Sequence, residues 1–212
     1  MVVRGYTPDE VKAVMQSMAF RRHEPKLYRC ILALQVSIGA RIHEVLSLKC
    51  GDVFERGIVL KRKIWLKKTK TGRRRLVVIP DYAAPYLLAW AHELAARGLL
   101  LFGRLFFVRA NGSAVSRFSV YRAYKAANDE LGLTHCGTHS ARKAWAAAQF
   151  RYWSDERRRG KDIDPLAMVA KIGGWETLDA CARYIGLDDF DPAPAQEHIG
   201  RVFFGSAPAQ KS

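Results

Sequence analysis

Three segments of the 212-residue chain carry residue types that could break and reseal a phosphodiester bond. Such a reaction needs a nucleophile that attacks phosphorus, cations that hold the two non-bridging oxygens, and an acid that protonates the departing 5′-oxygen. Arg41 and Arg142 are the candidate cations, and Tyr184 is the candidate nucleophile. Each of these residues also has an ordinary structural explanation, so the argument depends on what accompanies it.

The first two segments each place an arginine one helical turn from a second polar residue. Arg41 and Glu44 are separated by three positions, so they share one face of a short predicted helix, where an arginine can bind two phosphate oxygens. A surface ion pair is the alternative. His139 and Arg142 have the same spacing, and with Thr138 as N-cap they would lie at a helix N-terminus, where free backbone N–H groups favour an anion. A solvated basic helix start is the alternative there.

The third segment joins Trp175 to Tyr184, nine residues further along. Gly174 leaves room for a close approach between backbone and ligand, and Trp175 offers an indole N–H donor. On one straight helix the two aromatic residues would point in opposite directions. We therefore expect a bend, with Thr177 capping a new helix that carries Tyr184. The alternative role for both aromatics is packing in a core or an interface.

Helical periodicity surrounds these segments and predicts most of the fold. Predicted helices begin at Pro8, behind a Thr7 cap, and cover Pro25–Ile38, 40–48, 82–97, 116–131, 138–153, 165–172, Leu178–Ile185 and 196–203. Runs rich in β-forming residues over 57–65 and 74–79, joined by a Thr-Gly turn, predict a small antiparallel hairpin or three-stranded sheet that ends at Pro80. The expected fold class is mainly α with this small β unit (α+β).

The composition predicts a folded, basic protein. The net charge of +15 and the pI near 10.0 favour a polyanionic partner through attraction and counterion release, with an anionic membrane as the alternative. The four cysteines are far apart and include no CxxC pair, so we expect reduced thiols rather than a zinc site or disulfides. No signal segment, no apolar run of roughly 18 residues and no Asp/Glu cluster typical of magnesium stands out. We therefore expect a soluble, cytoplasmic protein without metal or cofactor.

In this order, the motifs resemble the catalytic domain of the phage integrase or tyrosine recombinase family. They are Arg41-xx-Glu44, a lysine-bearing hairpin, His139-xx-Arg142, and Trp175 and Tyr184 nine residues apart. The resemblance extends from about Tyr6 to Ile185, nearly the whole chain. It implies the fold of that domain and a site-specific DNA recombinase, which cuts and rejoins strands through a 3′-phosphotyrosyl intermediate.

The resemblance also implies roles for the individual residues. Arg41 and Arg142 would be the two phosphate-binding arginines, and Glu44 matches the acidic position that orients the first of them. His139 matches the histidine or lysine of the family. Tyr184 would be the nucleophile.

Two further positions depart from the commonest form of the family pattern. Trp175 stands where members carry histidine or, in the Cre type, tryptophan. Lys143 stands where many members have a histidine, outside the catalytic set. Neither difference removes a residue that the chemistry requires.

The family places a general acid in the β-turn, and Thr69-Lys70-Thr71-Gly72 resembles the Ser-Lys-Thr-Gly form of that turn. Lys70 is the expected acid, with Lys68 as the alternative, because a lysine among other cations loses its proton more readily. Basic residues around the same hairpin and beside the second arginine are expected to bind DNA: Lys67, Lys68, Arg73, Arg74, Arg75 and Lys143.

The implied organisation is a catalytic domain over residues 1–187 and a linker with a tail helix over 188–212, without the N-terminal core-binding domain of larger members. A fragment and a naturally small recombinase both fit this expectation. The tail resembles the family segment that packs into a neighbouring protomer, which implies self-association and a tetramer on paired sites of double-stranded DNA. Docking on its own domain is the alternative. The implied location is the nucleoid of a bacterial or phage-infected cell.

Other functions would use part of the same pattern. A type IB topoisomerase or a telomere resolvase would need nearly the same residues, and a catalytically silent DNA-binding regulator could keep the fold alone. A basic RNA-binding protein would explain the charge, but it would not explain the ordered motifs.

Overall fold

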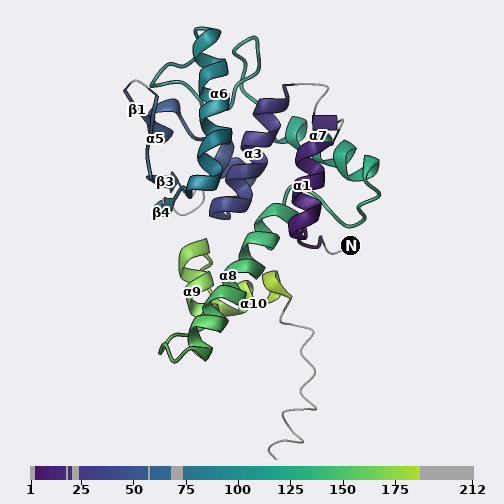
Figure 1. Cartoon of the computed structure of the whole chain (residues 1–212), viewed down its shortest axis with the longest axis vertical. Helices are drawn as coiled ribbons and strands as arrows, with labels where there is room; N and C mark the ends of the chain where they lie inside the picture. The colour runs from purple at the N-terminus through teal and green to yellow at the C-terminus, as the bar shows by residue number, and fades with distance from the viewer. Residues whose placement is uncertain (1–2, 18, 21–23, 57, 68–73, 187–212) are drawn as a thin grey trace, which may run out of the picture.

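Helices form most of the molecule, as the sequence predicts. The computed structural model describes residues 3–17, 19–20, 24–56, 58–67 and 74–186 (Figure 1). Its helices are α1 (Pro8–Gln16), α3 (Pro25–Ile38), α4 (Ile42–Leu46), α5 (Cys50–Val53), α6 (Ala84–Ala96), α7 (Arg117–Glu130), α8 (Ser140–Arg158), α9 (Pro165–Gly173) and α10 (Leu178–Ile185), with a 3-10 turn at Asp81–Ala83. The predicted mainly α class is confirmed.

The strands form two separate antiparallel pairs. They are β1 (Phe54–Glu55), β2 (Val59–Leu60), β3 (Lys63–Lys67) and β4 (Arg74–Val78). β1 pairs with β2, and β3 pairs with β4 from Lys63↔Val78 to Lys67↔Arg74. The three-stranded alternative is therefore wrong for the described residues. The expected strand over 57–65 is divided between two pairs because the chain bends at Arg62.

Several helix boundaries follow directly from local signals. In α1, the Thr7 hydroxyl accepts from the Glu10 backbone while the Glu10 carboxylate accepts from the Thr7 backbone, as a capping box requires. The bounds predicted for α3 are confirmed, and the helix ends at Gly39 with φ +59. α10 also has its predicted bounds, with Thr177 as its cap.

Four predicted helix starts are wrong by one or two residues, and the helices expected from 82 and 116 begin at Ala84 and Arg117. The helix expected over 40–48 covers only Ile42–Leu46, and Arg41 is its N-cap. α8 starts at Ser140, and the N-cap is His139 instead of Thr138. α8 also continues to Arg158, so part of the basic run at its end is helical. The tail helix and linker predicted after residue 187 lie outside the described residues.

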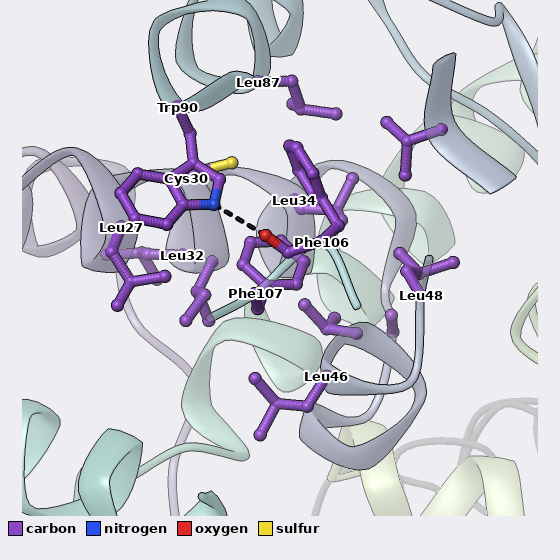
Figure 2. Close-up of a cluster of buried hydrophobic side chains, with 14 of the residues drawn as sticks. Leu27, Cys30, Leu32, Leu34, Leu46, Leu48, Leu87, Trp90, Phe106 and Phe107 are labelled. Atoms are coloured by element: carbon purple, nitrogen blue, oxygen red, sulfur yellow. Dashed lines mark hydrogen bonds between the residues drawn. The ribbon is translucent and has the colours of Figure 1, made fainter. Parts of the chain in front are cut away.

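The larger apolar core surrounds α3, which is buried along most of its length. Figure 2 shows its centre, where the indole N–H of Trp90 donates to the backbone carbonyl of Phe106 at 2.9 Å. Phe106 and Phe107 are fully buried although neither belongs to a helix or strand. This core fixes the end of α3 and the adjoining α4, and therefore the position of Arg41.

A second, smaller core lies among α8, α9 and α10. Trp145 and Ala146 of α8 pack against Val169 and Ala170 of α9 and Cys181 of α10. In Figure 1 these helices extend below the main body, and α8 links the two parts because it also packs against α3. Trp175 and Tyr184 are partly buried against this second core. The candidate nucleophile and the first candidate arginine therefore belong to different cores.

The remaining expectations from composition concern membrane, metal and thiols. None of the described helices combines the length and apolar character that a membrane span needs. The described residues contain no group of three or more His, Cys, Asp or Glu side chains placed to hold a metal ion. All four cysteines are free thiols, and Cys30, Cys50 and Cys181 are buried.

Candidate active site

Arg142 lies at the centre of the site and is almost completely buried, with 1% of its surface exposed. Its Nη1 donates to the carbonyl of Gly39, and its Nη2 donates to the carbonyl of Gly173 at 2.8 Å. These bonds use one N–H group on each of the two terminal nitrogens. Burial, together with the charges of Arg41 and Arg75, lowers the pKa of Arg142 to about 10. The side chain thus keeps its charge at neutral pH.

Arg41 is held by Glu44 through both its backbone and its side chain. The Glu44 carboxylate accepts from the Arg41 backbone N–H at 2.7 Å, and Arg41 Nη1 lies 3.5 Å from the other carboxylate oxygen. Burial by itself would raise the pKa of Glu44, but the charges of Arg75 and Arg142 and the bonds from Arg41 and Arg75 outweigh it and lower the pKa. The Arg41 side chain remains 28% exposed, whereas that of Glu44 is 1% exposed. Glu44 therefore acts as a buried anion that orients Arg41.

Arg75 has a position that differs from the surface cation expected from its sequence. Its side chain is only 13% exposed, and Nη2 lies 3.1 Å from Glu44 Oε2. Nη1 donates to the carbonyl of Ile172 at 3.1 Å, and Nη2 also donates to that of Gly39 at 3.3 Å. Its two terminal nitrogens are occupied by partners inside the molecule, and little of the side chain is exposed at the surface.

The carboxyl ends of α3 and α9 converge on these two arginines. Gly39 follows α3 in the left-handed region at φ +59, and Gly174 follows α9 at φ +70. A Cβ at Gly39 would lie 2.2 Å from Cε3 of Trp145, and one at Gly173 would lie 1.8 Å from Cζ3 of Trp175. Only glycine fits these close approaches, so the two helices can offer their last carbonyls to Arg142 and Arg75.

Trp175 and Tyr184 cover the guanidinium of Arg142. The Arg142 Cζ atom lies 4.2 Å from the ring centroid of Trp175 and 5.8 Å from that of Tyr184. The two aromatic rings are 5.1 Å apart, and Trp175 also stacks on Trp145 at 6.4 Å. The bend predicted between Trp175 and Tyr184 is present, because α9 ends before Trp175 and α10 starts after Thr177. Both aromatics thus reach the same cation.

Tyr184 also reaches His139. Its hydroxyl lies 3.5 Å from His139 Nδ1 and donates to the His139 carbonyl at 3.5 Å, at the outer limit of hydrogen-bonding distance. Burial raises the pKa of Tyr184, and the charges of Arg142 and Arg41 offset only part of this rise. Burial and the charges of Arg142 and Arg41 lower the pKa of His139. At neutral pH a protonated phenol therefore stands beside a neutral imidazole.

The structure brings together six of the candidate residues and leaves others apart. Those that meet within one site are Arg41, Glu44, His139, Arg142, Trp175 and Tyr184. Lys143 lies beside them, with its Nζ 5.4 Å from the centre of the Tyr184 ring. Lys67 and Arg74 are exposed and face each other at the end of the β3–β4 pair. Lys68, Lys70 and Arg73 lie outside the described residues.

Sequence reasoning missed the part played by Gly39, Gly173 and the buried Arg75. A double glycine at 173–174 and a glycine after a predicted helix were visible signals of helix ends. Their carbonyl partners were not visible, because Arg75 and Arg142 are far from them in the sequence. What the arrangement can do follows from its charges: two arginines, one phenol and one neutral base lie together, a set of groups suited to binding a phosphate.

Comparison with known proteins gives this site a context. The model of the phage integrase family matches residues 5–189. No curated protein sequence matches the chain. The fold is similar to several solved structures at low sequence identity, which relates the folds alone.

The XerH site-specific recombinase in a post-cleavage complex with its palindromic difH substrate has a TM-score of 0.64 at 18% identity, with 96% of this chain and 54% of that chain covered. XerA recombinase has a TM-score of 0.65 at 16% identity, with 96% and 66% covered. The lambda integrase catalytic core has a TM-score of 0.56 at 17% identity, with 81% and 91% covered. The chain thus spans between about half and two thirds of the Xer recombinases.

Proposed function

The chain belongs to the phage integrase family, and we propose that it is a tyrosine-type site-specific recombinase that cuts and rejoins DNA strands. Its family membership supports the class of reaction, and the geometry of the site supports the assignment of roles. The observation that carries the proposal is the meeting of Tyr184 on α10 with His139 and Arg142 at the start of α8, which is a separate segment of the chain. An unrelated basic protein would have no reason to bring these groups together.

In the proposed reaction, the Tyr184 oxygen attacks the phosphorus of the scissile phosphate. A bond from phosphorus to this oxygen forms while the bond from phosphorus to the 5′-oxygen breaks, which produces a 3′-phosphotyrosine and a free 5′-hydroxyl. The phenol proton passes to His139, which is neutral at pH 7, and Lys70 protonates the departing 5′-oxygen. The reverse steps reseal the strand, since the new phosphodiester is close in energy to the broken one.

Arg41 and Arg142 would bind the non-bridging oxygens, where negative charge increases in the transition state. Arg41 is partly exposed and held in place by Glu44, so it can form a bidentate contact with little loss of freedom. The indole N–H of Trp175 would provide one further donor. Arg142 contributes from beneath the two aromatic rings, and the burial of its charge makes the interaction with phosphate stronger than at an exposed position.

The proposed partner is double-stranded DNA. The net charge of +15 supports strong and salt-dependent binding to a polyanion. Lys67, Arg74 and Lys143 are the described cations that we assign to DNA contacts, and Lys68 and Arg73 belong to the same proposed set. Among the solved structures of similar fold, XerH is described as bound to its difH substrate, lambda integrase as bound to a COC' core site, and the Tn1549 transposon integrase as a complex with transposon right end DNA.

We further propose that residues 188–212 act as a linker and tail that joins one protomer to the next, while residues 1–187 form the catalytic domain. One lambda integrase structure is described as a tetramer bound to a Holliday junction, which supports a tetramer on paired sites. The proposed location is the nucleoid of a bacterial or phage-infected cell, where such substrates occur.

A covalent adduct tests the central proposal. We would incubate the protein with a pool of nicked suicide duplexes of randomised sequence and separate the products on a denaturing gel. Wild type and the control Tyr121→Phe, which changes an exposed tyrosine on α7, should both form an adduct through the 3′ end of the cut strand. Tyr184→Phe should form none. Absence of an adduct with wild type, or its persistence in Tyr184→Phe, would overturn the assignment.

A further inference from the structure

Arg75 contacts three parts of the molecule whose relative positions matter for the proposed reaction. It belongs to β4, the strand that follows the hairpin turn. From there it reaches the carboxylate of Glu44, which holds Arg41, and the carbonyl of Ile172, at the end of α9. It therefore contacts the larger core and the smaller core at the same time.

The contact with α9 lies directly at the turn that precedes Trp175. A Cβ added to Gly174 would lie 3.1 Å from the Cδ atom of Arg75, so the aliphatic stem of Arg75 packs against that turn. The turn is closed by a bond of 2.9 Å from the Trp175 backbone N–H to the Ala170 carbonyl. Arg75 therefore supports the turn that positions Trp175, which stacks on Arg142 and touches Tyr184.

The chemistry of the side chain fits this connecting position. Its two terminal nitrogens bond the carbonyls of Ile38, Gly39 and Ile172 and the carboxylate of Glu44, at 3.1 to 3.4 Å. Its Nε atom is buried and has no partner among the described residues. A planar guanidinium can span such a set, whereas the single ammonium of lysine cannot. The unpaired Nε indicates that the position is set by the groups that Arg75 joins.

We propose that Arg75 is a positioning residue, which holds the turn before Trp175, and with it Tyr184, against the Arg41–Glu44 pair. This inference rests on the proposed recombinase function. It predicts that Arg75 affects the rate of strand cleavage more than the affinity for DNA. A surface cation that grips phosphate would have the opposite effect, because it contributes mainly to binding.

The test compares Arg75→Gln and Arg75→Lys with two other cations of the same hairpin. Lys63→Gln is the control, since Lys63 is exposed at the far end of β3 and has no proposed role. Arg74→Gln removes the neighbouring charge, which is exposed and proposed to contact DNA. Affinity for the duplex is measured in a Tyr184→Phe background, and adduct formation is measured in a single turnover at saturating DNA.

Arg75→Gln should slow adduct formation at saturating DNA by about 100-fold, the effect of a displacement of about 1 Å at a reacting group. Arg74→Gln should mainly weaken DNA binding. Arg75→Lys keeps a positive charge beside Glu44, so its melting temperature should stay close to that of the wild type while its rate stays at least about 10-fold low. If Arg75→Gln does not fold, the comparison is made with Arg75→Lys alone.

A substrate with sulfur in place of the 5′-bridging oxygen separates two ways in which Arg75 could act. A thiolate leaves without a proton, so this substrate removes any defect in the general acid of the hairpin. The Arg75 variants should remain slow on it, because their defect lies in the alignment of Tyr184. The inference would be overturned if the Arg75 variants cleaved the sulfur substrate at the wild-type rate. It would also be overturned if their defect were confined to DNA affinity, or if they cleaved the ordinary substrate at or above the wild-type rate. A wild type without adduct would instead refute the proposed function itself.

Discussion

Replacing Gly39 by alanine tests whether the end of α3 must approach α8 as closely as the site requires. Gly39 has φ +59, and a Cβ there would lie 2.2 and 2.3 Å from two ring carbons of Trp145. Trp145 is 5% exposed and stacks on Trp175, so its ring has no free space into which to retreat. The added methyl group must therefore displace a part of the site.

The expected loss of stability has two parts. A residue other than glycine in the left-handed region costs about 1–2 kcal/mol. Inserting a methyl group into a packed core costs about 1–3 kcal/mol more. The free energy of unfolding should thus fall by about 2–5 kcal/mol. Gly98→Ala is the matched control, because Gly98 has φ +67 and no atom lies within 4 Å of its added Cβ, so that only the backbone cost applies.

Urea denaturation, followed by far-UV circular dichroism, measures the free energy of unfolding of both variants. The midpoint for Gly39→Ala should lie about 0.5–1.5 M below that for Gly98→Ala, if the slope is about 2 kcal/mol per molar urea. Near-UV circular dichroism should change only for Gly39→Ala, since that variant disturbs the stacked tryptophans. Equal losses for the two variants would refute the packing argument, because the backbone cost would then explain both.

Other predictions concern charge and thiol chemistry. Glu44→Gln should destabilise the fold by about 3–5 kcal/mol, because it leaves buried arginine charges unpaired. Glu93→Gln, which breaks two partly exposed ion pairs, should cost only about 1 kcal/mol. The pKa of Glu44 is lowered in the folded protein, so the stability from its ionisation is present above the ordinary pKa of about 4.3 and is lost as the pH falls through the folded value. Glu44→Gln should therefore reduce the loss of stability at acidic pH. An unchanged dependence of stability on acidic pH would contradict the assignment. The imidazole of His139 should titrate in NMR spectra below its ordinary value of about 6.5, and Lys143→Gln should raise the midpoint. A thiol reagent should modify Cys136 first, since the other three thiols are buried; simultaneous reaction of all four would contradict the fold.

The features that the sequence predicts best depend on neighbouring residues. α3 is bounded by Pro25 and Gly39, and α10 begins behind Thr177, so local chemistry determines both helices. The start of α8 depends on contacts from elsewhere. The backbone N–H of Tyr6 donates to the carbonyl of Ser140 at 3.3 Å, and this long-range contact lies at the first turn of the helix. The Gln35 side chain also donates to the Thr138 carbonyl at 3.2 Å, a contact across 103 residues that a local pattern does not reveal.

The position of Arg75 in the site also depends on long-range contacts that the sequence does not reveal. The sequence places it in a run of cations, which favours a solvated or DNA-binding loop. Alternation along β4 held a signal, since Arg75 shares a face with the buried Val77 and points away from the side of the exposed Leu76. Its partners were beyond prediction, because Glu44 lies 31 residues and Ile172 lies 97 residues away along the chain.

The charges of the site explain how a surplus of arginines can be stable inside the protein. Arg41, Arg75 and Arg142 surround one buried carboxylate, that of Glu44, which leaves an excess of positive charge. The last carbonyls of α3 and α9 face Arg75 and Arg142, and a helix carries partial negative charge at its C-terminus. These dipoles stabilise the cations without neutralising them. A phosphate would supply the missing negative charge, so the same arrangement that keeps the arginines buried also suits the binding of a phosphate.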